Sequence, residues 1–224
     1  EFIDFNINEM FPIVAEKQLA ECVDIFCEKD VFNIKQSRRY LKAASKYGFK
    51  LKIHADEITR LGGAELAAEL NCLSADHLLQ VSDKGIHDMS NSDVVATLLP
   101  LTAFSLKEKY ARARDMIDAG CIVALATDLN PGSSFSSSVP LLFALACIYM
   151  NLSPEEALTA FTINSAAAVG RADIIGSIDV GKQADMILLQ YPSYKFLPYN
   201  VGMNIVQNVI KKGEDCPYFY FLLF

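Results

Sequence analysis

A chain of 224 residues is long enough to bury one substantial hydrophobic core, as one large domain or as one domain with a small appendage. Hydrophobic residues make up 52% of it and charged residues 21%, which excludes a disordered or low-complexity chain. The net charge of −7, without a cluster of basic residues, argues against nucleic acid and against an anionic membrane as partners. The sequence also lacks an apolar run of the roughly 18 residues that span a bilayer.

The six cysteines form no CxxC pair, and five of them lie inside apolar runs. We therefore expect reduced, buried thiols and a cytoplasmic location rather than a disulfide framework. The first residues, EFIDFNINEMF, are acidic, lack the layout of a signal peptide and contain no initiator Met at position 1. We expect from this that the chain is the later part of a longer protein.

Apolar patterns along the chain predict strands and helices in alternation. The expected strands are 22–27, 50–53, 73–77, 94–99 and 122–126. The expected helices are 37–47, 66–70, 81–88, 106–119, 140–150 and one from Pro154 to the stop at Gly170. A strand about every 20–30 residues with a helix between is the period of a parallel α/β sheet.

After Gly170 the pattern changes to glycine turns and β-branched strands without long helices, in GSIDVGKQADMILLQ and NVGMNIVQNVIKKGE. We expect residues 1–173 to form a barrel domain and residues 174–215 to be part of a small β domain. Residues 216–224, which end in PYFYFLLF, carry no turn signal and yield no prediction.

The candidate functional residues follow three of the expected strands. His54 and His77 end two successive strands, and Asp128 ends the strand before the glycine-containing loop NPGSS. Active sites of α/β barrels lie at the carboxyl ends of the strands. The working hypothesis is that these three side chains converge on one site around a metal ion, since imidazole and carboxylate are common metal ligands.

Each candidate also has a plain structural explanation. His54 could be a buried core histidine whose ring nitrogens are hydrogen-bonded, and Asp128 could be a helix N-cap or a turn residue. Glu57 fits a solvated loop residue, and His77 fits a residue that orients a neighbour as well as a catalytic group. His87 reads as a surface histidine.

The motifs HADEI, GGAELAAEL, SADHL and ATDLNPGSS, with the terminal GSIDVGKQADMILL, resemble the amidohydrolase superfamily and, more narrowly, its imidazolonepropionases. The resemblance extends from about residue 22 to residue 214. It implies a (β/α)8 TIM-like barrel with a small β-sandwich appendage at the C-terminal end. It also implies one zinc or iron ion per site.

The resemblance assigns roles residue by residue. It implies that His54 and Asp128 are metal ligands and that Asp128 also moves protons. Glu57 resembles the carboxylate that contacts substrate and water, and His77 resembles a histidine that acts near the activated water. Three loop residues resemble the substrate-holding loop, namely Asn130, Gly132 and Ser133.

The implied reaction is hydrolysis of the cyclic amide of 4-imidazolone-5-propanoate to N-formimidoyl-L-glutamate in histidine degradation, by metal-activated water. The expected partners are this small-molecule substrate and, as an option, a second copy of the chain in a homodimer. The sequence departs from the family in lacking a His-x-His pair and the strands before Cys22, so we expect an incomplete barrel. Alternatives are another amidohydrolase, such as a purine or pyrimidine deaminase, and a truncated, metal-free chain without activity.

Overall fold

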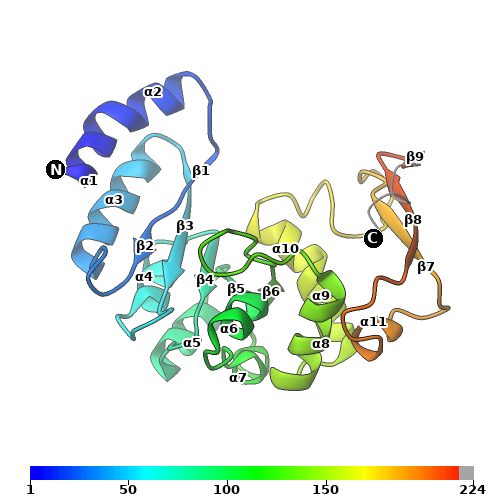
Figure 1. Ribbon diagram of the computed structural model, residues 1–224. Coiled ribbons are helices and arrows are strands. Elements are labelled where there is room, and N and C mark those ends of the chain that lie inside the picture. The colour runs from blue at the N-terminus through cyan, green and yellow to red at the C-terminus, as the bar shows by residue number, and fades with distance from the viewer. Residues whose placement is uncertain (217–224) are drawn as a thin grey trace. The chain divides into compact units, whose positions relative to one another are not determined.

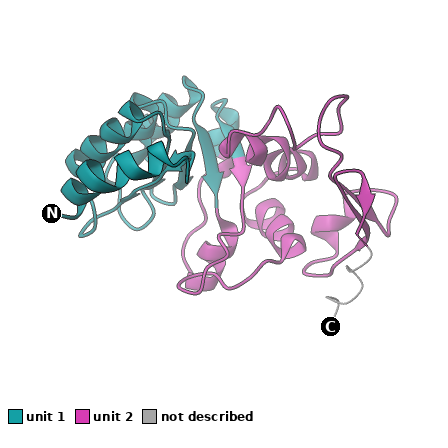
Figure 2. Ribbon diagram, turned by 90° about the horizontal axis from the view of Figure 1, so that it is seen from above, with its two compact units in different colours: residues 1–98, 115–123 teal, residues 99–114, 124–224 magenta. Residues whose placement is uncertain are grey.

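The computed structural model describes residues 1–216, which are drawn as a ribbon in Figure 1. They divide into two compact units, coloured separately in Figure 2. Unit 1 comprises residues 1–98 and 115–123, and unit 2 comprises residues 99–114 and those from 124 onward. The tail for which the sequence yields no prediction lies outside the described residues, apart from Cys216.

A parallel sheet forms the centre of unit 1. Its strands are β1 (Cys22–Val23), β2 (Phe26–Cys27), β3 (Lys50–Ala55), β4 (Ser74–His77), β5 (Val95–Leu98) and β6 (Ile122–Leu125), the last of which ends in unit 2. Their order is β1-β3-β4-β5-β6, with β2 also paired to β3. The register of the sheet places Ile53 beside Ala75, and the pairs from β1 to β5 are parallel. The predicted alternation of strands and helices around a parallel sheet is confirmed.

In unit 1, helices precede and separate these strands along the chain. They are α1 (Phe2–Phe5), the π-helix η1 (Asn6–Met10), α2 (Phe11–Glu16), α3 (Ile34–Lys46), α4 (Gly63–Glu69), α5 (Asp83–Ser90) and α7 (Ala113–Asp118), which begins in unit 2. Asn33 caps α3, because its side chain accepts a hydrogen bond from the Gln36 amide. Leu41, Ile53 and Leu66 are almost completely buried, so α3, β3 and α4 share one core.

Unit 2 combines helices with a small antiparallel sheet. Its helices are α6 (Pro100–Leu106), α8 (Val139–Tyr149), α9 (Pro154–Phe161), α10 (Ile163–Ala168) and α11 (Phe196–Tyr199). Its sheet has the order β7-β8-β9, from β7 (Met186–Leu189), β8 (Val206–Lys211) and β9 (Glu214–Asp215). These strands lie within the stretch predicted as a β appendage, whereas its assignment as a β-sandwich stays a prediction.

Two of the predicted helices are interrupted in the structure. The helix expected over 106–119 is wrong: α6 starts at Pro100 and ends where Lys107 takes a left-handed φ of 58°, before α7 starts at Ala113. The helix expected from Pro154 to Gly170 is broken at Thr162 into α9 and α10. There the Ser165 hydroxyl donates to the Ala160 carbonyl at 2.7 Å, which a continuous helix would pair with a backbone amide.

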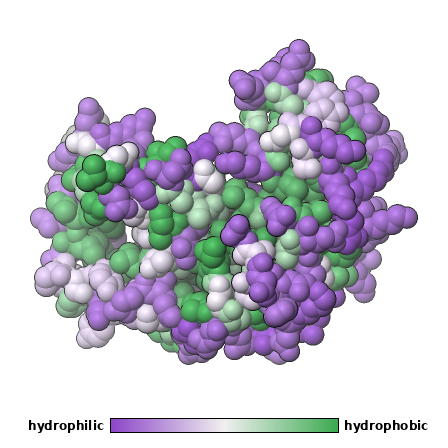
Figure 3. Space-filling model, turned by 180° about the vertical axis from the view of Figure 1, so that it is seen from behind, coloured by the Kyte–Doolittle hydropathy of each residue, from purple (hydrophilic) through white to green (hydrophobic). Residues whose placement is uncertain are grey.

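The molecular surface carries both hydrophilic and apolar residues. Hydrophilic residues cover most of the face in Figure 3, and apolar residues reach the surface in groups between them. Exposed apolar side chains include Phe2 and Phe5 of α1 and Ile187 and Leu188 of β7. In residues 1–216, the helices are too short or too polar to cross a membrane.

Candidate active site

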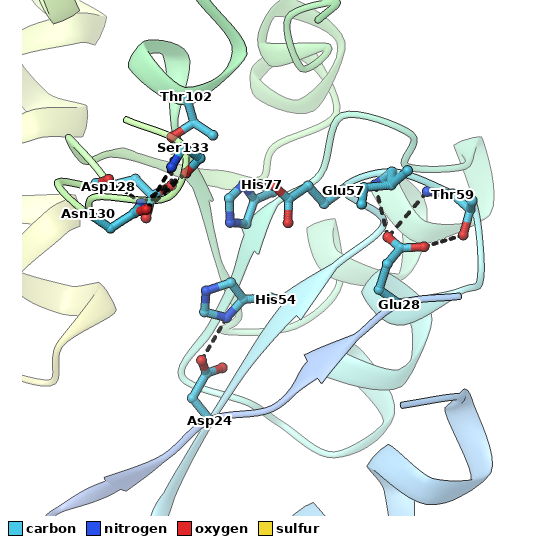
Figure 4. A network of polar contacts seen from close by, with 11 residues as sticks. Asp24, Glu28, His54, Glu57, Thr59, His77, Thr102, Asp128, Asn130 and Ser133 are labelled. Carbon is cyan, nitrogen blue, oxygen red and sulfur yellow. Dashed lines mark hydrogen bonds and ion pairs between the residues drawn. The ribbon is translucent and has the colours of Figure 1, made fainter. Parts of the chain in front are cut away.

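His54 lies near the end of β3, beside Phe26 of β2 and Asp76 of β4 in the sheet register. Its Nδ1 lies 2.6 Å from Oδ2 of Asp24, which follows β1 (Figure 4). Burial alone would lower the pKa of His54, but the Asp24 carboxylate, with Asp76 and Glu57 at longer range, raises this pKa to about 8. The contact holds the ring so that Nε2 is the nitrogen left for another ligand.

His77 ends β4 and is 3% exposed, with a left-handed φ of 76°. Its Nδ1 lies 3.3 Å from Oε1 of Glu57, and its ring centroid lies 5.1 Å from that of His54. Positive φ is uncommon outside glycine, and such strained conformations gather at functional sites. Unit 1 therefore brings together three of the predicted site residues, His54, His77 and Glu57, with each imidazole facing a carboxylate (Figure 4).

Asp56 organises the turn between β3 and α4. Its fully buried carboxylate accepts hydrogen bonds from the four consecutive amides of residues 61–64, at 2.8 to 3.2 Å. These amides lead into the start of α4, where backbone N–H groups lack helical partners and the helix dipole favours negative charge. Gly63 must be glycine for packing, because a Cβ there would lie 2.8 Å from the Ala55 side chain.

Glu28, which follows β2, is a second buried carboxylate near this turn. It accepts hydrogen bonds from the amides of Ile58 and Thr59 and from the Thr59 hydroxyl (Figure 4). Sequence reasoning missed Glu28 and Asp24, because their partners lie about 30 residues further along the chain and leave no local pattern.

A polar network lies on the same face of the sheet as His54. Ser74 donates to Oδ1 of Asp76 at 2.7 Å, Lys52 contacts the Ser74 hydroxyl, and its Nζ lies 3.5 Å from Oδ2 of Asp76. Asp76 is thus a buried ion-pair partner placed beside His54, a position that the sequence alone did not indicate.

Asp128 follows β6 in unit 2, with a left-handed φ of 50°. The hydroxyl of Thr102, buried in the first turn of α6, donates to Oδ2 of Asp128 at 2.6 Å. A carboxylate has about four acceptor positions, so this hydrogen bond leaves the others, including those of Oδ1, to a ligand or proton. Thr102 is a further residue that the sequence did not single out.

The loop after Asp128 is held by Asn130. The Asn130 side-chain oxygen accepts from the amides of Gly132 at 2.8 Å and Ser133 at 2.9 Å, and its Nδ2 donates to the Asp128 carbonyl at 2.8 Å (Figure 4). The loop amides that could bind a substrate carboxylate are therefore already paired with Asn130. A bound substrate would have to replace the Asn130 oxygen or use the Ser133 hydroxyl.

The donor chemistry fits a first-row metal ion such as zinc or iron, which takes imidazole nitrogen and carboxylate oxygen. His54 offers Nε2, because Asp24 lies against Nδ1, and Asp128 offers Oδ1, because Thr102 occupies Oδ2. A carboxylate behind a ligating imidazole is a recurrent arrangement in metal sites. Within residues 1–216, however, no three His, Cys, Asp or Glu side chains gather closely enough to hold an ion.

A model of the Amidohydrolase family matches residues 36–215. The chain belongs to the amidohydrolase family. It is 66% identical over 217 residues to an imidazolonepropionase of Bacteroides thetaiotaomicron, which covers 97% of this chain and 52% of that protein. It is 64% identical over 214 residues to an imidazolonepropionase of Parabacteroides distasonis, which covers 96% of this chain and 51% of that protein. The chain thus spans about half the length of the curated relatives that it matches.

Solved structures share the fold at low sequence identity. An adenosine deaminase from Xanthomonas campestris with bound zinc superposes with a TM-score of 0.77 at 20% identity, covering 92% of this chain and 55% of that one. Molinate hydrolase gives a TM-score of 0.71 at 19% identity, covering 93% and 54%. Likeness at these identities shows the fold alone, and it confirms a TIM-barrel-like α/β fold with a parallel sheet.

Proposed function

We propose that this chain serves in the hydrolysis of 4-imidazolone-5-propanoate to N-formimidoyl-L-glutamate, a step of histidine degradation. The observation that carries the proposal is the identity of 62–66% to proteins named imidazolonepropionase, extending over almost the whole chain. The geometry supports it from the residues upward, because each unit presents titratable side chains at the ends of its strands.

His54 and Asp128 are the proposed ligands of one metal ion, zinc or iron. The zinc in the Xanthomonas deaminase supports this choice of metal class. Such an ion would supply a Lewis acid that polarises the ring carbonyl and lowers the pKa of water. Within this chain, Asp24 has the task of holding the His54 ring in place for that ion.

The chain's own carboxylates perform the proton transfers. Asp128, fixed through Oδ2 by Thr102, accepts a proton from the attacking water at Oδ1 and gives it to the ring nitrogen as the C–N bond breaks. Glu57, held against His77, contacts the substrate and the water. His77 stabilises the charge that develops at the carbonyl oxygen by donating a hydrogen bond.

The proposed substrate-binding loop comprises Asn130, Gly132 and Ser133 beside Asp128. A carboxylate of the substrate is a stronger acceptor than the neutral Asn130 amide oxygen, so it competes well for the Gly132 and Ser133 amides. We further propose that residues 1–173 act as the barrel portion and 174–215 as part of a small β-sandwich, and that the protein is cytoplasmic and pairs as a homodimer.

Turnover tests the proposal. Purified protein loaded with zinc or iron should consume 4-imidazolone-5-propanoate and release N-formimidoyl-L-glutamate, and it should leave cytosine, guanine and adenosine unchanged. Asp128→Asn should abolish the product, whereas His87→Ala, at an exposed histidine of α5, should not. If the protein deaminated a base and did not open the imidazolone ring, it would be a deaminase and the proposal would be wrong. Inactivity on every substrate would refute the proposal for this chain.

A further inference from the structure

Glu28 is a buried carboxylate without a task in the proposed reaction. It is 1% exposed, and a charge removed from water is tolerated where hydrogen bonds replace its hydration. Four donors do so. Oε2 accepts from the amides of Ile58 at 2.9 Å and Thr59 at 3.2 Å, and Oε1 accepts from the Lys29 amide at 2.7 Å and from the Thr59 hydroxyl.

Three of the four donors belong to the two residues that directly follow Glu57. The Ile58 side chain is 67% exposed, so apolar packing does little to fix this part of the chain. Asp56 holds the next amides, from residue 61 onward, and does not reach residues 58 and 59. Glu28 is therefore the main anchor of the peptide units just after Glu57.

We propose that Glu28 is a positioning residue that sets the orientation of the Glu57 side chain toward His77. The peptide group is planar, so a hydrogen bond to the Ile58 amide fixes the plane that leaves the Cα of Glu57. Glu57 Oε1 lies 3.3 Å from His77 Nδ1, a distance that a small rotation of that plane would change. The catalytic importance of Glu57 rests on the proposed function, whereas the contacts that orient its side chain do not.

The protonation of Glu28 agrees with this task. Burial alone would raise the pKa of Glu28, but the hydrogen bonds from the Thr59 hydroxyl and from the amides of Ile58, Lys29 and Thr59 lower it overall. The anchor is thus a charged carboxylate, which accepts from amides more strongly than a neutral side chain would.

Two variants weaken the anchor by different routes. Glu28→Gln keeps the shape and places an amide against donors, and Thr59→Val removes the hydroxyl contact while leaving the buried carboxylate in place. Thr59→Ser retains the hydroxyl and is the conservative rescue. Glu69→Gln, at an exposed carboxylate that pairs with Arg38, is the matched control for loss of a charge.

The measurement is amide hydrogen exchange of residues 57–60 together with the imidazole ¹⁵N resonances of His77 in the same samples. Glu28→Gln should speed exchange of the Ile58 and Thr59 amides about tenfold and shift the His77 resonances. Thr59→Val should move both in the same direction, and Thr59→Ser and Glu69→Gln should leave both unchanged.

Unchanged exchange and unchanged His77 resonances in Glu28→Gln would overturn the proposal, even if global stability fell. If Glu28→Gln fails to fold, the same two readouts compared between Thr59→Val and Thr59→Ser test the proposal. Equal exchange and equal His77 resonances in these two variants would overturn it. Both readouts are made without substrate, so they succeed or fail independently of the turnover that tests the proposed function.

Discussion

Replacing the buried carboxylate of Asp56 is the perturbation whose cost the structure defines most closely. In Asp56→Asn the three bonds to Oδ1 are retained, and the bond from the Ala64 amide to Oδ2 becomes a contact between two donors. A hydrogen bond to a charged group contributes about 1.5–3 kcal/mol, so we expect Asp56→Asn to lower the free energy of unfolding by about 2–3 kcal/mol.

Asp56→Ala should cost more, for two reasons. All four amides lose their acceptor, and the Gly63 and Ala64 amides belong to buried residues that water does not reach. Alanine also loses about 1–2 kcal/mol at the φ of 49° that Asp56 adopts, whereas asparagine tolerates this conformation. We expect a total of about 5 kcal/mol or more, which is comparable to the whole stability of many domains.

Urea unfolding monitored by circular dichroism measures these costs, with amide exchange of residues 61–64 as the local readout. Asp30→Ala is the control, because Asp30 is exposed and has a φ of 63°, so it reports the conformational cost alone at about 1 kcal/mol. If Asp56→Ala cost no more than Asp30→Ala, the four hydrogen bonds would contribute nothing to stability and the reasoning would be refuted.

Three further outcomes are expected. The pKa of Glu28 in the folded protein lies below its ordinary 4.5, so its contribution to the free energy of unfolding is complete above pH 4.5 and is lost as the pH falls through the folded value. Unfolding free energies measured at decreasing pH should show this loss, and the loss should be smaller in Glu28→Gln. Thr102→Val should lower kcat about tenfold or more by releasing Asp128, with Thr102→Ser near normal; equal kcat in both would contradict this assignment. Gly63→Ala should lower the free energy of unfolding by about 1–3 kcal/mol, because the new Cβ clashes with Ala55. An unchanged melting temperature would contradict this and show that β3 moves to make room for the methyl group.

The sequence predicts the alternation of strands and helices well, because periodicity and capping are local. The helix expected over 37–47 is confirmed as α3, although it begins earlier, after the Asn33 cap. The strand that leads to His54 is confirmed as β3. Helix ends set by backbone conformation were not predictable: α6 stops at Lys107, a residue without the glycine signal for a left-handed end. Apolar spacing that continued to Ile117 indicated one long helix instead.

The positions of the candidate residues at strand ends could be predicted from motifs, whereas their contacts with distant segments could not. His54, His77 and Asp128 carry such motifs. Their partners are Asp24, which follows β1, and Thr102 of α6. Both are distant from them in the sequence and follow no local rule. Asp56 left no such signal either, because the amides that it accepts from lie five to eight residues further on, beyond the reach of an ordinary Asx turn.

We propose that His54 and Asp128 bind the same metal ion. Metal content per chain, measured by mass spectrometry on purified protein and on His54→Ala and Asp128→Ala, tests it directly, with His87→Ala as the control. We expect about one zinc or iron ion per chain, lost in both site variants and kept in the control. Full metal content in either site variant, or none in the unmodified chain, would contradict the claim.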